Sequence, residues 1–219
     1  MPLDLRVVRG GDDVPASLQR LAVLGHPQSA RLTSERVRDD PDLLHFIDDE
    51  SERWHYHLVA FSCTFAPEPE QRIFASYVQV TLTNVDAADA PEPIAVSMEP
   101  LKQEQLRPLS LSAKITLPVV LSTEVSVTDS KERQRVALEA RYEGTSRPAW
   151  HFFETDAKGV TGMHRLRFIV RVPRGVTAAG TLSAGASVGF RGTGVRRFSY
   201  RSSLRTETAG PTFTLSARL

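Results

Sequence analysis

Cysteine is nearly absent from this chain of 219 residues: Cys63 is the single one, so no disulfide can form within the chain. It lies in an alternating apolar run with Phe61 and Phe65, without the base and the cationic surroundings that a nucleophilic thiol needs. This pattern predicts a buried, unreactive side chain. A lone cysteine also favours a reducing compartment, and the cytoplasm is the predicted location.

Long apolar runs are absent as well. No stretch approaches the ~18 consecutive apolar residues that indicate a membrane-spanning helix. The first residues, MPLDLRVVRGGDD, lack the apolar core and the cleavage site of a secretory signal. We therefore expect no transmembrane segment and no membrane contact.

Catalytic motifs are also missing. The sequence has no Gly-x-Ser-x-Gly elbow, and Gly189, Gly192 and Gly194 fit neither a phosphate-binding loop nor a dinucleotide fingerprint. The sequence therefore favours a protein without catalytic activity and without a cofactor. One alternative stays open. His55 and His57 share a face of a predicted strand, a spacing that suits a metal-dependent enzyme.

Acidic residues are scarce at the end of the chain. Residues 158–219 contain eleven Arg or Lys and one acid, Glu207, whereas residues 1–157 contain sixteen bases and twenty-five acids. The formal net charge of the whole chain, +1, hides this division. A basic surface of this kind needs an anionic counterpart: nucleic acid, a lipid headgroup, a partner protein or the acidic part of the same fold.

Two helix signals occur near the beginning of the chain. Residues 12–24 combine acidic residues and Pro15 with apolar residues three and four apart, which predicts a short helix. Asp40 followed by Pro41 predicts a capped second helix that runs to about Glu52. We therefore predict a helical N-terminal region over residues 1–53.

From residue 54 the apolar period changes to 2, which is typical of strands. The pattern predicts about nine strands and hence a mainly β protein, with an antiparallel β-sandwich of jelly-roll or immunoglobulin-like type over residues 54–219. The predicted runs include 54–65, 72–84, 111–121, 182–190, 196–204 and 212–219. Runs 149–155 and 163–172 flank a short loop with Gly159, which predicts a β-hairpin.

Strand alternation turns the basic segment into two arginine stripes. Residues two apart on a strand project to the same side, so each of two strands carries three guanidinium groups on one face. The first stripe is Arg165, Arg167 and Arg171, and the second is Arg197, Arg201 and Arg205. If both strands belonged to one sheet, six guanidinium groups would share a surface.

The densest group of acids is a candidate counterpart for these stripes. It surrounds the second predicted helix and consists of Asp39, Asp40, Asp42, Asp48, Asp49, Glu50 and Glu52. The sequence therefore predicts a binding or assembly module whose arginine face contacts an acidic protein surface: its own N-terminal region, another subunit or a partner.

Three further alternatives for the function remain open. Nucleic-acid binding has the required cations but no recognised motif. Anionic lipid is a second possible anion for the same cations. A third alternative is a β pore-former, because residues 176–190 are small and uncharged, as in some membrane-inserting hairpins.

Overall fold

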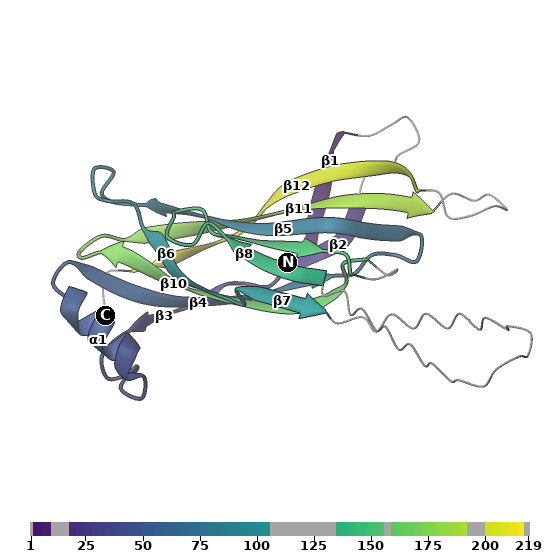
Figure 1. Cartoon of the computed structure of the whole chain (residues 1–219). Coiled ribbons are helices and arrows are strands. Elements are labelled where there is room, and N and C mark those ends of the chain that lie inside the picture. The colour runs from purple at the N-terminus through teal and green to yellow at the C-terminus, as the bar shows by residue number, and fades with distance from the viewer. Residues whose placement is uncertain (1, 10–17, 106–134, 156–158, 192–199, 217–219) are drawn as a thin grey trace, which may run out of the picture.

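The computed structural model describes residues 2–9, 18–105, 135–155, 159–191 and 200–216. These residues form long antiparallel strands and one short helix, α1 (Pro41–Glu50) (Figure 1). The predicted fold class, a mainly β protein built from antiparallel sheets, is therefore confirmed. The described part of the chain contains no helix that is both long enough and apolar enough to cross a bilayer.

Two sheets are joined through a shared strand. The first runs in the order β6 (Ile94–Glu99), β10 (Gly162–Pro173), β4 (Trp54–Phe65), β2 (Leu18–Leu24) and β1 (Pro2–Arg9), and β3 (Gln28–Leu32) also pairs with β4. The second runs in the order β12 (Tyr200–Leu215), β11 (Ala178–Arg191), β5 (Gln71–Asn84), β9 (Ala149–Phe153), β8 (Arg135–Arg141) and β7 (Lys102–Gln105). Because β1 also pairs with β12, it connects the first sheet to the second.

The main core lies between the two sheets. Phe61 of β4 packs edge-on against Trp150 of β9, with ring centroids 5.8 Å apart, and Phe65 packs against Phe152 at 5.0 Å. All four rings are almost fully buried. Such edge-to-face contacts add to the area that aromatic side chains bury. They hold the two layers face to face.

Helix α1 covers part of the outer face of the first sheet. Asp40 caps its N-terminus by accepting a hydrogen bond from the Leu43 backbone N–H at 3.1 Å, and Pro41 occupies the first turn, as predicted. Ile47 is the residue that the helix buries, against Val37 and Tyr56. This second, smaller core is separate from the one between the sheets.

The prediction of a helix over residues 12–24 is wrong. Residues 18–24 form strand β2, which pairs with the end of β4 through Ala22 and Phe65. Its apolar spacing fits a helix locally, but pairing within the sheet buries Leu21, Ala22 and Leu24 in the main core. The proposed division at residue 53 stays a prediction, although β2 and β3 pair with β4 across it.

The predicted hairpin over 149–172 is also wrong. Strand β9 pairs with β5 and β8 in the second sheet, whereas β10 pairs with β4 and β6 in the first. Strands β9 and β10 therefore lie in different layers. The two strands predicted over 196–204 and 212–219 correspond to one strand, β12, and the run 111–121 lies outside the described residues.

Candidate functional site

Strand β10 presents the first arginine stripe on the outer face of its sheet, as the alternation predicts. Leu166, Phe168, Val170 and Val172 are buried in the main core. Arg165 and Arg167 are exposed and Arg171 is partly buried on the opposite side. The three arginines therefore share one face, but each has different surroundings.

Arg171 is held beneath helix α1. Its Nη1 lies 3.5 Å from the Glu50 Oε2, and its guanidinium stacks 4.5 Å from the centroid of the Trp54 ring. The Tyr56 hydroxyl donates to the same Glu50 carboxylate. Burial, followed by this hydrogen bond, raises the pKa of Tyr56 above its ordinary value. Arg171 thus joins the basic strand to the acidic helix within one chain.

Arg165 and Arg167, the other two arginines of the stripe, differ in whether a carboxylate is paired with them. Arg167 forms an ion pair with Glu99 at the end of β6. Arg165 has no ion-pair partner among the described residues. Within the described part of the chain, the positive charge of the stripe is therefore compensated at Arg167 and Arg171 but not at Arg165.

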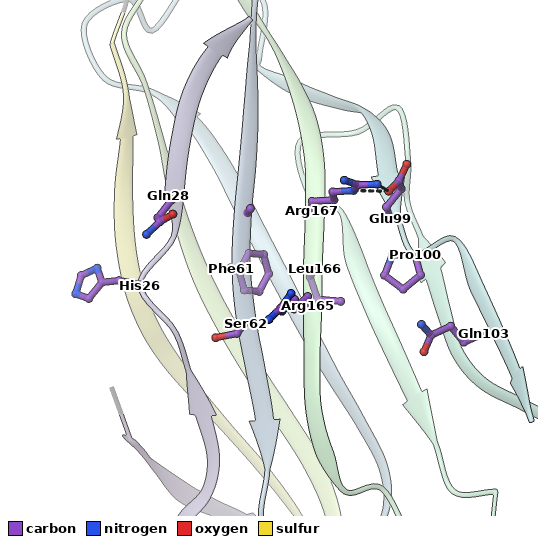
Figure 2. A pocket seen from close by; sticks show the side chains of 11 residues that line it. His26, Gln28, Phe61, Ser62, Glu99, Pro100, Gln103, Arg165, Leu166 and Arg167 are labelled. Carbon is purple, nitrogen blue, oxygen red and sulfur yellow. Dashed lines mark hydrogen bonds and ion pairs between the residues drawn. The ribbon is translucent and has the colours of Figure 1, made fainter. Parts of the chain in front are cut away.

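A groove of about 610 Å³ lies beside Arg165 (Figure 2). Strands β4 and β10 form its floor, His26 and Gln28 stand on one side, and Pro100 and Gln103 stand on the other. The groove forms because the outward residues of β4 here, Ala60 and Ser62, are small. Gly25 precedes His26 and lets the chain pass close to β4, since a Cβ there would lie 2.4 Å from the Ser62 Oγ.

A second hollow, of about 650 Å³, lies beside helix α1. Its lining is mainly apolar, with Phe46 and Leu43 from the helix and Leu58 and Ile169 from the sheet. Glu99 and Arg167 line both this hollow and the groove beside Arg165. The two spaces therefore adjoin at this ion pair, and polar residues make up a larger share of the lining in the groove than in the hollow.

The acids predicted as a counterpart mostly do not meet the arginine stripe. Glu50 is the member that contacts Arg171. Asp40 caps α1, Asp48 accepts from Ser34, Asp49 pairs with His45 at 3.3 Å, and Asp39 lies beside Arg38. Asp42 and Glu52 are exposed. Most of these acids that have a partner therefore contact residues of α1 or of the turns next to it.

The second predicted stripe lies elsewhere. Arg201 and Arg205 belong to β12, and three strands, β4, β2 and β1, separate β12 from β10 along the sheet order. Arg197 lies outside the described residues. A surface shared by six guanidinium groups requires both strands to belong to one sheet. Strand β10 belongs to the first sheet and β12 to the second, so this requirement is not met.

His55 and His57 face the main core at one end of β4. Both are buried, with exposed fractions of 5% and 4%, and their ring centroids lie 5.1 Å apart. Burial lowers the pKa of each from 6.5 to about 4, and Arg31 adds to the effect on both. No group of three or more potential metal-ligating His, Cys, Asp or Glu residues occurs in the described part of the chain. With pKa values lowered this far, both imidazoles are neutral at pH 7.

Two other sequence features prove to be parts of the core. Cys63 is completely buried, which raises the pKa of its thiol to about 12, as expected of an unreactive side chain.

The uncharged segment over 176–190, considered as a membrane-inserting hairpin, contains most of β11, which pairs with β5 on one side and β12 on the other. Leu182, Ala184 and Val188 of this strand are buried. This segment is a central strand of the folded protein.

The sequence did not single out the groove itself. Its walls come from the segment before β3 and the first residue of that strand, and from the β6–β7 connection and β7, and only the long-range pairing brings these to β4 and β10. One signal was available. Ala60 and Ser62 interrupt an otherwise bulky strand on its outward face, and small outward residues beside an arginine stripe indicate a hollow.

Comparison with known proteins gives distant structural likeness only. No protein-family description and no curated protein matches the sequence. Among solved structures, Clostridium perfringens delta-toxin is 10% identical, with a TM-score of 0.28 over 74% of this chain and 77% of the toxin. A structure titled pore forming protein is 6% identical, with a TM-score of 0.34 over 96% and 93%.

A third solved structure is the Clostridium perfringens NetB toxin in its membrane-inserted form, 6% identical, with a TM-score of 0.33 over 89% of this chain and 94% of the toxin. TM-scores this low do not establish a common fold. The likeness therefore carries no functional argument for this chain.

Proposed function

We propose that this protein assembles on a membrane and inserts paired strands to form a pore. The observation that carries the proposal is the pairing of β7 with β8, in which Gln105 lies opposite Arg135. Residues 106–134 connect these two positions, so the connection leaves and re-enters the sheet at one point. We propose that this connection is the segment that enters the membrane as a hairpin.

The sequence of this connection has the alternation of a membrane-spanning hairpin. In residues 109–117 apolar and polar residues alternate without a break, and alternation returns in 124–128. The first apolar set is Leu109, Leu111, Ala113, Ile115 and Leu117, interleaved with Ser110, Ser112, Lys114 and Thr116. A transmembrane strand needs ~9–11 residues with an apolar face toward lipid and a polar face toward water. Counted along the sequence, the midpoint between Gln105 and Arg135 is residue 120, two residues after Pro118, and we propose that the inserted hairpin turns there.

Self-assembly follows from the physics of such a hairpin. Within a bilayer the outer edges of a single hairpin would leave backbone N–H and C=O groups without partners, each at a cost of several kcal/mol. Hairpins from several chains satisfy these groups by pairing side by side. The proposal therefore keeps self-association from the sequence-based hypothesis. It departs from the expectation of no membrane contact, and the cytoplasmic location stays a prediction.

The arginine stripe does not carry a separate function here. Two of its three members are paired with carboxylates of the same chain, at Glu50 and Glu99. These contacts favour docking within the chain over an interface with an acidic partner. The metal-dependent alternative lacks a third protein ligand in the described residues, and the inserting role falls to 106–134 instead of 176–190.

Dye release from phospholipid vesicles tests the proposed pore. Ile115→Asp places a carboxylate on the apolar face of the hairpin, where it would meet lipid in every subunit, and we expect release to fall roughly tenfold or more. Thr116→Asp adds the same charge one residue further on, on the polar face, and should leave release close to that of the unmodified protein.

Two outcomes would contradict the proposal. The first is absence of release from every vesicle composition by a correctly folded protein, judged by its circular dichroism and thermal unfolding. The second is an equal effect of the two aspartate variants, because a hairpin in a bilayer must distinguish its two faces.

A further inference from the structure

The groove beside Arg165 and the hollow beside α1 adjoin each other on the outer face of the first sheet. We propose that together they bind one molecule of an anionic phospholipid, with the headgroup phosphate at Arg165 and an acyl chain along the apolar hollow. The inference rests on the proposed membrane function, for which it names the ligand. It is argued from the charge and lining of the two spaces.

The polar half has one uncompensated cation and several neutral hydrogen-bonding groups. Arg165 is exposed and has no ion-pair partner among the described residues, whereas Arg167 is paired with Glu99. A guanidinium group binds phosphate with two parallel hydrogen bonds, a geometry that lysine lacks. Gln28, Ser62 and Gln103 line the same groove and supply further donors (Figure 2). The polar half therefore suits a phosphate group.

The apolar half has the lining that an acyl chain requires. Leu43 and Phe46 of α1 face Leu58, Val96 and Ile169 of the sheet across this hollow. Phe46 keeps 40% of its surface exposed, although it is a large apolar side chain. Burying such surface against lipid is favourable because it removes apolar area from water. An occupant with an apolar chain would cover it.

The charges fix the direction in which the lipid would lie. Asp40 and Asp42 line the apolar hollow at the helix N-terminus, and both would repel a phosphate placed there. Arg165 lines only the groove at the other end. The headgroup is therefore expected at the Arg165 end and the chain toward α1. Inorganic phosphate alone would leave the apolar half uncovered, and lipid is the occupant to which both halves are complementary.

Calorimetric titration with a short-chain lipid below its micelle concentration tests the inference without any membrane. The probe is dihexanoyl phosphatidic acid, compared with inorganic phosphate at the same charge. We expect saturable binding of the lipid and at most weak binding of phosphate. Arg165→Gln should weaken lipid binding about fivefold or more, the effect of one cation near anionic lipid.

Two further variants separate this site from general charge attraction. Arg147→Gln removes the same charge at an exposed position outside the groove and should bind the lipid normally. Ala60→Leu keeps every charge but fills the floor of the groove at an exposed position, and we expect it to weaken binding as much as Arg165→Gln does.

Several results would overturn the inference. These are no binding of the lipid, equal binding of lipid and phosphate, or equal losses in Arg165→Gln and Arg147→Gln. Dye release distinguishes this failure from failure of the pore proposal. If the protein releases dye but does not bind lipid at the groove, the pore proposal stands and the lipid site is refuted. If it binds lipid but releases no dye, the lipid site stands and the pore proposal is refuted.

Discussion

At the scale of single residues, identical side chains on one strand meet different partners. Arg165, Arg167 and Arg171 alternate regularly on β10, but Arg171 lies against Trp54 and Glu50 while Arg165 borders an open groove. Alternation predicts which face a residue occupies. It does not predict the partner, because Glu50 and Glu99 come from elements far away in the sequence.

His55 and His57 give a pH-dependent prediction. Their pKa values are about 4 in the folded protein and 6.5 as ordinary values, so the unfolded chain binds protons first as pH falls. The stability that they contribute is complete above about pH 6.5 and is lost as pH falls toward about 4. Between about pH 7 and pH 5 we expect the free energy of unfolding to fall by on the order of 1–2 kcal/mol per histidine.

Urea unfolding at several pH values measures this dependence. Replacing both histidines by Phe keeps aromatic rings at these buried positions but removes the groups that titrate. The free energy of unfolding should then depend less on pH over this range. A double variant that keeps the slope of the unmodified protein would show that other groups cause it.

At the scale of elements, the sequence predicts those whose signal is local. The bounds of β4 match the prediction at both ends, because twelve residues of strand-like pattern lie between a helix and a Pro-rich turn. Helix α1 was predicted because Asp40 and Pro41 form a cap that depends on adjacent residues only. Strand β2 was missed, since its pairing with β4 outweighs a spacing that also fits a helix.

The candidate site was predictable only in part for the same reason. The orientation of Arg165 and Arg167 follows from the alternation of β10, and the sequence predicted it. The groove depends on β3, β4 and the β6–β7 connection meeting on one face. The mistaken hairpin over 149–172 shows the limit, because the sequence between β9 and β10 does not reveal that the two strands belong to different sheets.

The cap of α1 gives a prediction at this scale. Asp40→Ala removes the acceptor for the Leu43 N–H, and such a loss destabilises a helix by about 1 kcal/mol. We expect amide hydrogen exchange in the first turns of α1 to speed up about fivefold, which corresponds to that energy. Asp39→Ala removes the same charge next to the cap, where the side chain is 97% exposed, and should leave exchange unchanged. Equal acceleration in both variants would attribute the effect to charge alone.

At the scale of the whole molecule, the structure accounts for part of the division of charge along the chain. Acids from the first part meet bases from the last part within one fold, at Glu50 with Arg171 and at Glu99 with Arg167. These contacts join the acidic helix and the end of β6 to the basic strand β10. The basic segment is therefore compensated in places without a second chain.

This compensation predicts the state of the protein away from membranes. If the arginine stripe docked onto acids of another subunit, the protein would form an oligomer that salt dissociates, because exposed charges are screened beyond ~10 Å at about 0.1 M salt and ~3 Å at about 1 M. Since Arg167 and Arg171 are paired within the chain, we expect a monomer of 24.2 kDa at both low and high salt. Light scattering coupled to size exclusion measures the mass directly. Arg171→Gln should leave that mass unchanged at either salt concentration. A dimer that dissociates at high salt, or in this variant, would instead support an interface between the arginine stripe and the acids of another subunit.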